Sequence, residues 1–240
     1  MCIAAIFDVD GTLYRDSLMV EHFKKLIKYE VLDPMIWHES AKEKFENWAK
    51  RHGDYEDYLL EIAEIHLSNL KGLDKDYVNF ITEQVVRLKG DRVYRFTRDR
   101  IKWHQSEGHL VIFISGSPSF LLEKMAVKYH VNCYRGTEYL IDENNKFTGE
   151  LIPMWDSESK IVALNEFVRK YNIDLNKSYA YGDTTGDLDM LKIVGHPVLI
   201  NPIKKLVDEV QASQEFMDKA EFIVERKDVI YKIPSNIDTL

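Results

Sequence analysis

The chain has 240 residues and is 45% hydrophobic, which is enough for one sizeable core with a smaller appended module. Its formal net charge of -8 argues against a broad basic face for nucleic acid. Two cysteines are too few for a disulfide framework or a cysteine-based zinc site, so we expect a protein of the reducing cytoplasm. No basic leader or long apolar segment is present, and we expect neither a signal peptide nor a membrane span.

A short apolar strand at residues 3–7 opens the chain, and helical patterning follows from about residue 18 to residue 89. The first helix covers residues 18–31. The next three begin after the caps Asp33-Pro34, Asp54 and Asp74 and end near Gly53, Gly72 and Gly90. Four helices with short links predict a helical module, residues 16–90, inserted after the first strand.

Beyond Gly90, helical and apolar segments alternate. The predicted helices are 92–107, 120–129, 157–171 and 188–193, and the predicted strands are 110–114, 179–181, 197–200 and 222–224, with a hairpin at 139–152. Uninterrupted apolar strands between helices indicate a parallel sheet covered on both faces. The sequence therefore predicts an α/β fold with a Rossmann-like core, residues 1–15 and 91–240.

Three polar clusters follow predicted strands, at the edge where open parallel sheets bind ligands. They are DVDGT after residues 3–7, SGSP after 110–114 and GDTTGD after 179–181. These segments bring four acids together: Asp8, Asp10, Asp183 and Asp187. Because so many carboxylates repel at close range, we expect a hard divalent cation, and Mg²⁺ prefers oxygen ligands.

Groups of opposite character accompany the acids. Ser115, the Gly116 amide and Lys160 can donate to an anion, and Ser117-Pro118 is predicted to start the next helix, whose N-terminus also favours an anion. A metal on one side and donors on the other fit a phosphoryl group. Taken singly, each cluster also fits a turn or a helix cap, and Lys160 fits a solvated helix lysine; the prediction depends on their joint occurrence.

Several other motifs are absent or incomplete. DVDGT lacks the glycine position of a calcium loop, and neither a nucleotide P-loop nor a Gly-x-Ser-x-Gly elbow occurs. The histidines form no metal pair of helical spacing. Ser157 to Lys160 matches the short Ser-x-x-Lys pattern of acyl-transfer enzymes, without that family's other signatures.

The combination FDVDGTL, FISGSP, Lys160 and YGDTTGDLDML resembles the four motifs of the haloacid dehalogenase-like superfamily, in its phosphoserine phosphatase-like branch. The segments RGTEYLIDENNKFTGELI and GHPVLINP also look like this branch, and residues 16–90 resemble its helical cap. The resemblance covers residues 3–202 and implies a magnesium-dependent phosphatase that acts on a small phosphorylated metabolite.

The resemblance also implies roles for individual residues. Asp8 would be the nucleophile that becomes phosphorylated, and Asp10 the general acid and base. Mg²⁺ would be held by Asp8, the Asp10 carbonyl and Asp183, with Asp187 binding directly or through a neighbour. Substrate binding would fall to Ser115, Gly116 and Lys160, with help from the amides of Gly11 and Thr12.

One departure concerns the substrate. Phosphoserine phosphatases place an amine-binding glutamate nine residues after the nucleophile, where this chain has Ser17 beside Asp16. Phosphoserine is therefore a doubtful substrate. Asp16 could bind an amine or simply cap a helix, and Arg51 and Trp155 are further candidates for substrate contact.

Two other functions remain open. A phosphotransferase or mutase would use the same core and yield a phosphorylated acceptor. A non-enzymatic phosphate- or metal-sensing protein would bind without turnover, although nothing in the four motifs is disrupted.

Overall fold

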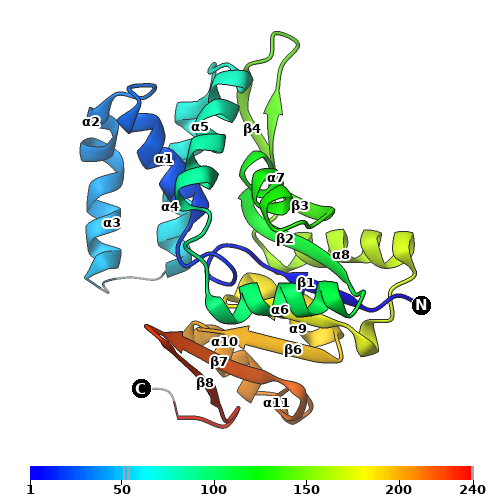
Figure 1. The fold of residues 1–240 in the computed structure, drawn as a ribbon. Helices are drawn as coiled ribbons and strands as arrows, with labels where there is room; N and C mark the ends of the chain where they lie inside the picture. The colour runs from blue at the N-terminus through cyan, green and yellow to red at the C-terminus, as the bar shows by residue number, and fades with distance from the viewer. Residues whose placement is uncertain (51, 53–54, 239–240) are drawn as a thin grey trace.

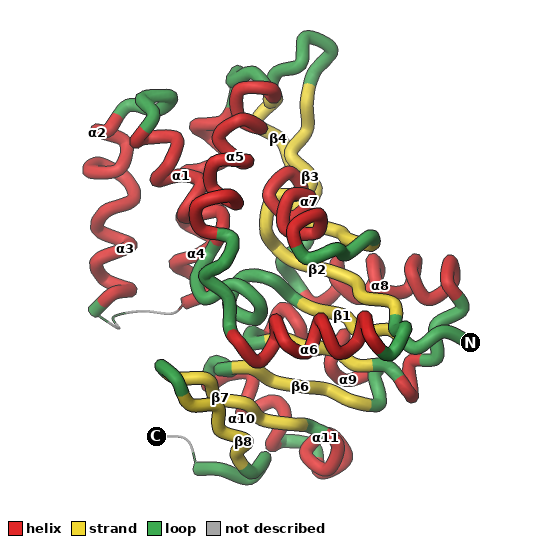
Figure 2. Tube along the Cα trace, viewed as in Figure 1, coloured by secondary structure: helices red, strands yellow, loops and turns green. Residues whose placement is uncertain are grey.

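The computed structural model describes residues 1–50, 52 and 55–238, which form one mixed sheet with helices on both faces and a helical module beside it (Figures 1 and 2). The strand order is β4-β3-β2-β1-β5-β6-β7-β8. Strands β3 to β7 in this order are parallel, and the two edge strands are antiparallel to their neighbours. The strands are β1 Ala4–Phe7, β2 Leu110–Pro118, β3 Cys133–Ile141, β4 Phe147–Ile152, β5 Tyr179–Gly182, β6 His196–Ile200, β7 Glu221–Arg226 and β8 Val229–Ile233.

Strand β1 lies in the middle of the sheet, between β2 and β5, and every one of its side chains is fully buried. Its alternate residues face two different cores: Ala5 and Phe7 pack on one side, and Ala4 and Ile6 on the other. Helices α6 (Arg95–Ser106) and α7 (Ser119–Lys128) contribute to the first core, and α8 (Ser157–Tyr171), α9 (Leu188–Ile193) and α10 (Lys204–Gln211) to the second. The predicted α/β class is therefore confirmed.

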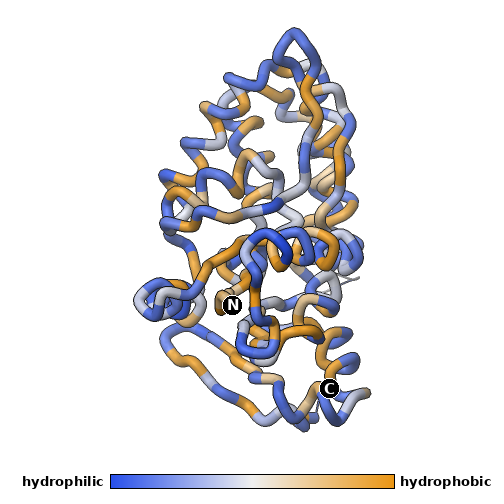
Figure 3. Tube along the Cα trace, turned by 90° about the vertical axis from the view of Figure 1, so that its right-hand side faces the viewer, coloured by the Kyte–Doolittle hydropathy of each residue, from blue (hydrophilic) through white to orange (hydrophobic). Residues whose placement is uncertain are grey.

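The helical module consists of α1 (Leu18–Lys28), α2 (Pro34–Ile36), the π-helical turn η1 (Trp37–Ala41), α3 (Lys42–Ala49), α4 (Tyr55–Leu70) and α5 (Lys75–Lys89). It has a core of its own, which also includes Tyr139 of β3 and Phe147 of β4. The module therefore packs against the β3–β4 hairpin as well as internally (Figure 1). The hairpin's turn, at the top of Figure 3, is hydrophilic.

Most predicted boundaries agree with the structure to within a few residues. Asp33 and Asp74 cap their helices as expected, accepting hydrogen bonds from the backbone amides of Met35 and Asp76. The first helix ends earlier than predicted, at Lys28, and the second is interrupted by η1. The predicted cap Asp54 and the predicted helix end at Gly53 lie outside the described residues.

The predicted cap Ser117 is wrong. Strand β2 continues through Pro118, which itself precedes the first turn of α7, and the Ser117 hydroxyl donates to Asp10 instead of capping a helix. After residue 200, the chain contains three elements that were not predicted: α10, α11 (Gln214–Lys219) and β8. Two short 3-10 turns, η2 (Leu175–Lys177) and η3 (Thr185–Asp187), were also not predicted. Within the described residues, no helix is both long and apolar enough to cross a bilayer.

Candidate active site

The carboxyl ends of β1, β2 and β5 meet the first turn of α8 at one place, as predicted. β1 pairs with both β2 and β5, so the loops that follow these strands are neighbours. Gly11 turns the first loop with φ of 84°, a conformation that favours glycine. A Cβ atom at this position would lie 2.1 Å from a carboxylate oxygen of Asp183, so glycine is also required for space.

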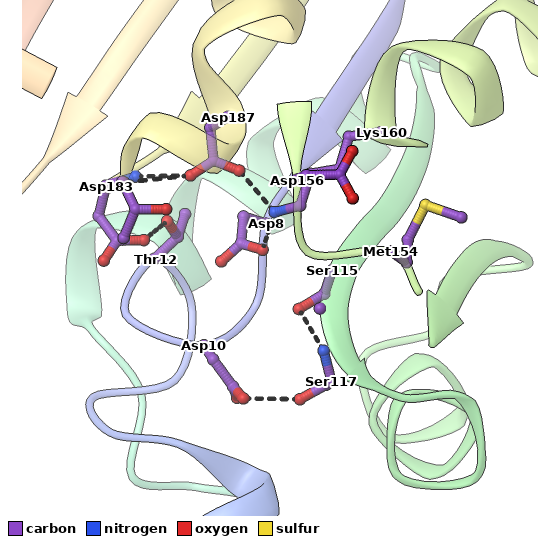
Figure 4. A network of polar contacts seen from close by, with 12 residues as sticks. Asp8, Asp10, Thr12, Ser115, Ser117, Met154, Asp156, Lys160, Asp183 and Asp187 are labelled. Carbon is purple, nitrogen blue, oxygen red and sulfur yellow. Dashed lines mark hydrogen bonds and ion pairs between the residues drawn. The ribbon is translucent and has the colours of Figure 1, made fainter. Parts of the chain in front are cut away.

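Lys160 lies at the centre of the site, where α8 places its side chain almost completely buried. Its Nζ donates to Asp8 Oδ1 at 2.8 Å and to Asp187 Oδ1 at 2.7 Å (Figure 4). Burial by itself lowers the pKa of Lys160, but the carboxylates of Asp187 and Asp8 raise it above its usual value. The ammonium group therefore stays charged and links two acids from different strand ends.

Asp187 is occupied on both oxygens. Besides Lys160, it accepts hydrogen bonds from the backbone amides of Asp183 and Thr184, at 3.0 Å and 3.2 Å. It forms a capping box with Thr184 at the start of η3. Its contacts therefore orient both Lys160 and the loop that carries Asp183.

The carboxylates of Asp8, Asp183 and Asp187 have ligand atoms within 4.8 Å of one another, all of them buried. Burial raises the pKa of Asp8 to about 7, against the opposing effect of Lys160. Burial and the nearby Asp8 also raise the pKa of Asp183 well above its usual range, although Thr12 donates to it at 2.7 Å. This donor set of hard oxygens with excess negative charge fits Mg²⁺.

Asp10 faces a different set of partners. Its carboxylate accepts a hydrogen bond from the Ser117 hydroxyl at 2.7 Å (Figure 4). It also accepts from the Leu18 amide at 3.0 Å and the Ser17 hydroxyl at 3.2 Å. Burial raises the pKa of Asp10 to about 6, and these hydrogen bonds limit the rise. A carboxyl group held in one orientation with such a pKa can exchange a proton near neutral pH.

A cavity of about 460 Å³ opens above these residues and is lined by Asp8, Asp10, Ser115, Gly116 and Lys160 among others. Ser17 and Trp155 also line it, the former as the N-cap of α1. The structure thus brings most of the predicted site residues together around one space.

Asp16 is placed differently. It is exposed, accepts a hydrogen bond from the Ser17 amide and is not among the residues that line the cavity. Thr12 and Gly11 contact Asp183 rather than the cavity. Arg51 lies outside the described residues.

Several cavity residues escape prediction from the sequence. Tyr139 and Thr185 belong to a predicted hairpin and a motif without an assigned role, and Ser117 was predicted only to start a helix. Glu56 and Asp57 resemble ordinary acids at the start of a helix. Thr185 donates to Glu56 at 2.5 Å, joining the loop after β5 to helix α4. No sequence signal distinguishes these acids from solvated ones, because their position depends on how α4 packs over the sheet.

Comparisons with known proteins extend over most of the chain. The sequence profile of haloacid dehalogenase-like hydrolases matches residues 5–192. A histidinol-phosphatase of Neisseria meningitidis serogroup C is 26% identical over 219 residues, covering 86% of this chain and 94% of that protein. Phosphoserine phosphatase SerB1 of Mycobacterium tuberculosis is 25% identical over 240 residues, covering 97% of this chain and 75% of that protein.

Solved structures share the fold. A protein of unknown function from Bordetella pertussis superposes with a TM-score of 0.72 at 21% identity, over 88% of this chain and 96% of its own. A phosphoserine phosphatase, in a form that mimics the phospho-aspartyl intermediate, superposes with a TM-score of 0.63 at 19% identity over 95% of both chains.

Proposed function

Because the chain belongs to the haloacid dehalogenase-like hydrolases, and is a phosphatase of their phosphoserine phosphatase-like branch, we propose that it is a magnesium-dependent phosphomonoester hydrolase that uses Asp8 as its nucleophile. The observation that carries this proposal is the bridge from Lys160 to Asp8 and Asp187, at the bottom of a cavity large enough for a small phosphate ester.

In the proposed first step, a carboxylate oxygen of Asp8 attacks phosphorus, and the bond from phosphorus to the leaving-group oxygen breaks. Asp10 donates its proton to that oxygen, so the alcohol leaves neutral. The products are an aspartyl phosphate on Asp8 and a carboxylate on Asp10.

In the second step, Asp10 accepts a proton from water as the water oxygen attacks the same phosphorus. The acyl phosphate bond breaks, releasing inorganic phosphate and restoring the Asp8 carboxylate. The pKa of Asp10, raised by burial to about 6, suits a group that must both give and accept a proton.

Charge balance explains the surrounding residues. A carboxylate that approaches a phosphate dianion meets repulsion, which the Lys160 ammonium offsets from a buried position. Bound Mg²⁺ would supply further positive charge between Asp8 and Asp183, with the Asp10 carbonyl as a third ligand. Ser115 and the Gly116 amide would hold the phosphoryl oxygens from the β2 side of the cavity.

We also propose that residues 16–90 act as a cap over a core formed by 1–15 and 91–240. Helices α1 and α4 supply cavity residues such as Met19 and Leu59, and Glu56 of α4 is bonded to Thr185 of the core. Closure of the cap would exclude water other than the attacking molecule. Both cysteines are free, which accords with a cytoplasmic enzyme.

The test is hydrolysis of p-nitrophenyl phosphate with Mg²⁺. Asp8→Asn should lower kcat/KM by more than about 10³-fold, because the amide cannot act as the nucleophile. Asp99→Asn, which changes an exposed aspartate on α6, should leave kcat/KM as it is. Brief reaction followed by mass spectrometry should detect one added phosphoryl group on Asp8. Full activity in Asp8→Asn would refute the nucleophile, and phosphate delivered to an added alcohol instead of water would indicate a phosphotransferase.

A further inference from the structure

The cavity has two chemically distinct ends. One end holds the proposed phosphate site, with Asp8, Asp10 and Lys160. The other end is formed by the first turns of α4, where Glu56 and Asp57 line the same space together with the apolar Leu59 and Leu60. A phosphate ester bound at the first end must place its leaving group toward the second.

The charge at the second end is negative. Among the cavity-lining residues that the structure describes, Lys160 is the only basic one, and it is already bonded to two carboxylates. Asp57 forms no hydrogen bond or ion pair with any other described residue. Glu56 accepts from Thr185 on one oxygen, and its other oxygen is 3.7 Å from the exposed Lys205 ammonium group.

The remaining wall is suited to a carbon framework near a cation. Leu59 and Leu60 offer apolar surface, and the aromatic residues Tyr139 and Trp155 also line the cavity. Aromatic faces attract cations as well as apolar groups. An ammonium group would meet two carboxylates and these aromatic residues, whereas a carboxylate would meet no basic side chain other than Lys160 among the described residues that line the cavity.

From this arrangement we infer that the substrate is the phosphate monoester of an amino alcohol: its leaving group carries a protonated amine, bound near Glu56 and Asp57, and no carboxylate. The inference rests on the proposed phosphatase function. It separates an amino alcohol phosphate from phosphoserine, which carries an amine and a carboxylate on the same carbon.

The first experiment compares three esters of matched size: 2-aminoethyl phosphate, ethyl phosphate and 2-phosphoglycolate, which differ in charge at the far end. We expect kcat/KM to be at least tenfold higher for 2-aminoethyl phosphate than for ethyl phosphate, and lowest for 2-phosphoglycolate. L-histidinol phosphate should likewise be hydrolysed better than L-phosphoserine.

The second experiment changes the acids. In Glu56→Gln with Asp57→Asn, the ratio of kcat/KM between 2-aminoethyl phosphate and ethyl phosphate should fall to near one. Glu64→Gln, an exposed glutamate of the same helix, is the matched control and should keep the wild-type ratio. A merely structural role of the acids at the helix N-terminus would lower both rates together and leave the ratio unchanged.

The outcomes distinguish a wrong substrate class from a wrong enzymatic function. Hydrolysis of p-nitrophenyl phosphate without preference for the amine ester, or with L-phosphoserine as the better substrate, would overturn this inference and leave the phosphatase proposal standing. An unchanged ratio in the double variant would also overturn it. No hydrolysis of any of these esters would refute the proposed function and the inference with it.

Discussion

Two buried groups of ionisable side chains distinguish the sheet edge from the helical module. In the candidate active site, the carboxylates of Asp8, Asp183 and Asp187 lie within 4.8 Å of one another, and Lys160 donates to Asp8 and Asp187. In the module, His22 of α1 and His66 of α4 are hydrogen bonded between Nδ1 and Nε2 at 3.0 Å, and both are fully buried. His66 Nδ1 lies 3.2 Å from the hydroxyl of Tyr139 on β3.

Burial opposes charge in both groups but leads to different results. It lowers the pKa of His22 to about 3 and that of His66 well below its usual value, so the pair is neutral and its hydrogen bonds are internal. The carboxylates cannot reach neutrality in this way at pH 7, because Lys160 holds part of the group ionised. The histidine pair is neutral and hydrogen bonded within the module, with only His22 Nε2 left without a partner among the described residues, whereas the acidic group lacks positive charge. This difference separates a structural from a functional use of buried polar residues.

The largest expected effect comes from removing the lysine. Lys160→Met should lower kcat/KM by about 10²-fold or more, since the proposed nucleophile Asp8 and the phosphate lose their cationic neighbour. It should also lower the free energy of unfolding by about 3–5 kcal/mol, because two buried carboxylates lose their partner. Urea denaturation and p-nitrophenyl phosphate hydrolysis measure both effects. Lys128→Met, which breaks a surface pair with Asp91, should cost at most about 1 kcal/mol. Equal losses of activity and of unfolding free energy in Lys160→Met and Lys128→Met would contradict a functional role of the buried lysine.

The second effect concerns the positive charge that the acidic group lacks and that Mg²⁺ would supply. Mg²⁺ at about 100 times its Kd should raise the free energy of unfolding of the wild type by about 2.7 kcal/mol. Binding should strengthen as pH rises through about 7, where Asp8 ionises, because protons compete with the metal. Asp183→Asn should abolish most of the stabilisation in a thermal melt, whereas Asp142→Asn in the hairpin turn should retain it. A melting temperature that Mg²⁺ does not move would count against the metal site.

The third prediction uses pH to separate the two groups in the metal-free protein. As pH falls below 6.5, unfolded histidines bind protons that the folded pair does not, so each histidine lowers stability by up to about 1.4 kcal/mol per pH unit. Asp8 and Asp10 act in the opposite direction between about pH 7 and 3.8, since the folded state binds their protons more tightly. The histidine contribution is therefore the difference between the wild type and His22→Leu/His66→Met.

Above pH 7.5, the free energies of unfolding of the wild type and the double variant should differ only by a constant packing cost. Below pH 6.5, the wild type should lose stability relative to the double variant, and the loss should increase as the pH falls. His38→Gln, an exposed histidine on η1, provides the matched control and should follow the wild type. Parallel curves for the wild type and the double variant in urea denaturation from pH 8 to pH 5 would show that the pair titrates normally.

The smallest effect tests whether burial alone makes a carboxylate functional. Glu225 is buried, yet it accepts hydrogen bonds from Arg15 Nη2 at 2.6 Å and from the amides of Arg95 and Phe96 at 3.0 Å and 2.8 Å. Glu225→Gln should cost about 1–3 kcal/mol of unfolding free energy and leave phosphatase activity unchanged. Glu221→Gln changes a partly exposed glutamate on the same strand that is paired with Lys232, and should cost less than about 1 kcal/mol. A loss of activity in Glu225→Gln would show that this carboxylate is functional and would contradict its assignment as a structural one.

The sequence alone predicts the α/β class, the inserted helices and the segments that meet at the site. These depend on local features: apolar runs, caps such as Asp33 and Asp74, and polar residues directly after strands. The carboxyl ends of parallel strands lie at the same edge of a sheet. The positions of Asp8, Ser115 and Asp183 directly after predicted strands were therefore enough to predict that they lie close together. The helical pattern at residues 157–171 correctly placed Lys160 in the first turn of α8.

What the tertiary structure decided involves contacts between distant segments. The role of Ser117 changed from a helix cap to a partner of Asp10, because β2 runs farther than its apolar residues indicate. Glu56 and Asp57 reach the cavity only through the packing of α4 over the sheet, and His22 meets His66 only inside the module's core. Local pattern thus determined which chemical groups end each strand. Long-range packing determined how charge is distributed around them, and hence which leaving group the cavity can accept.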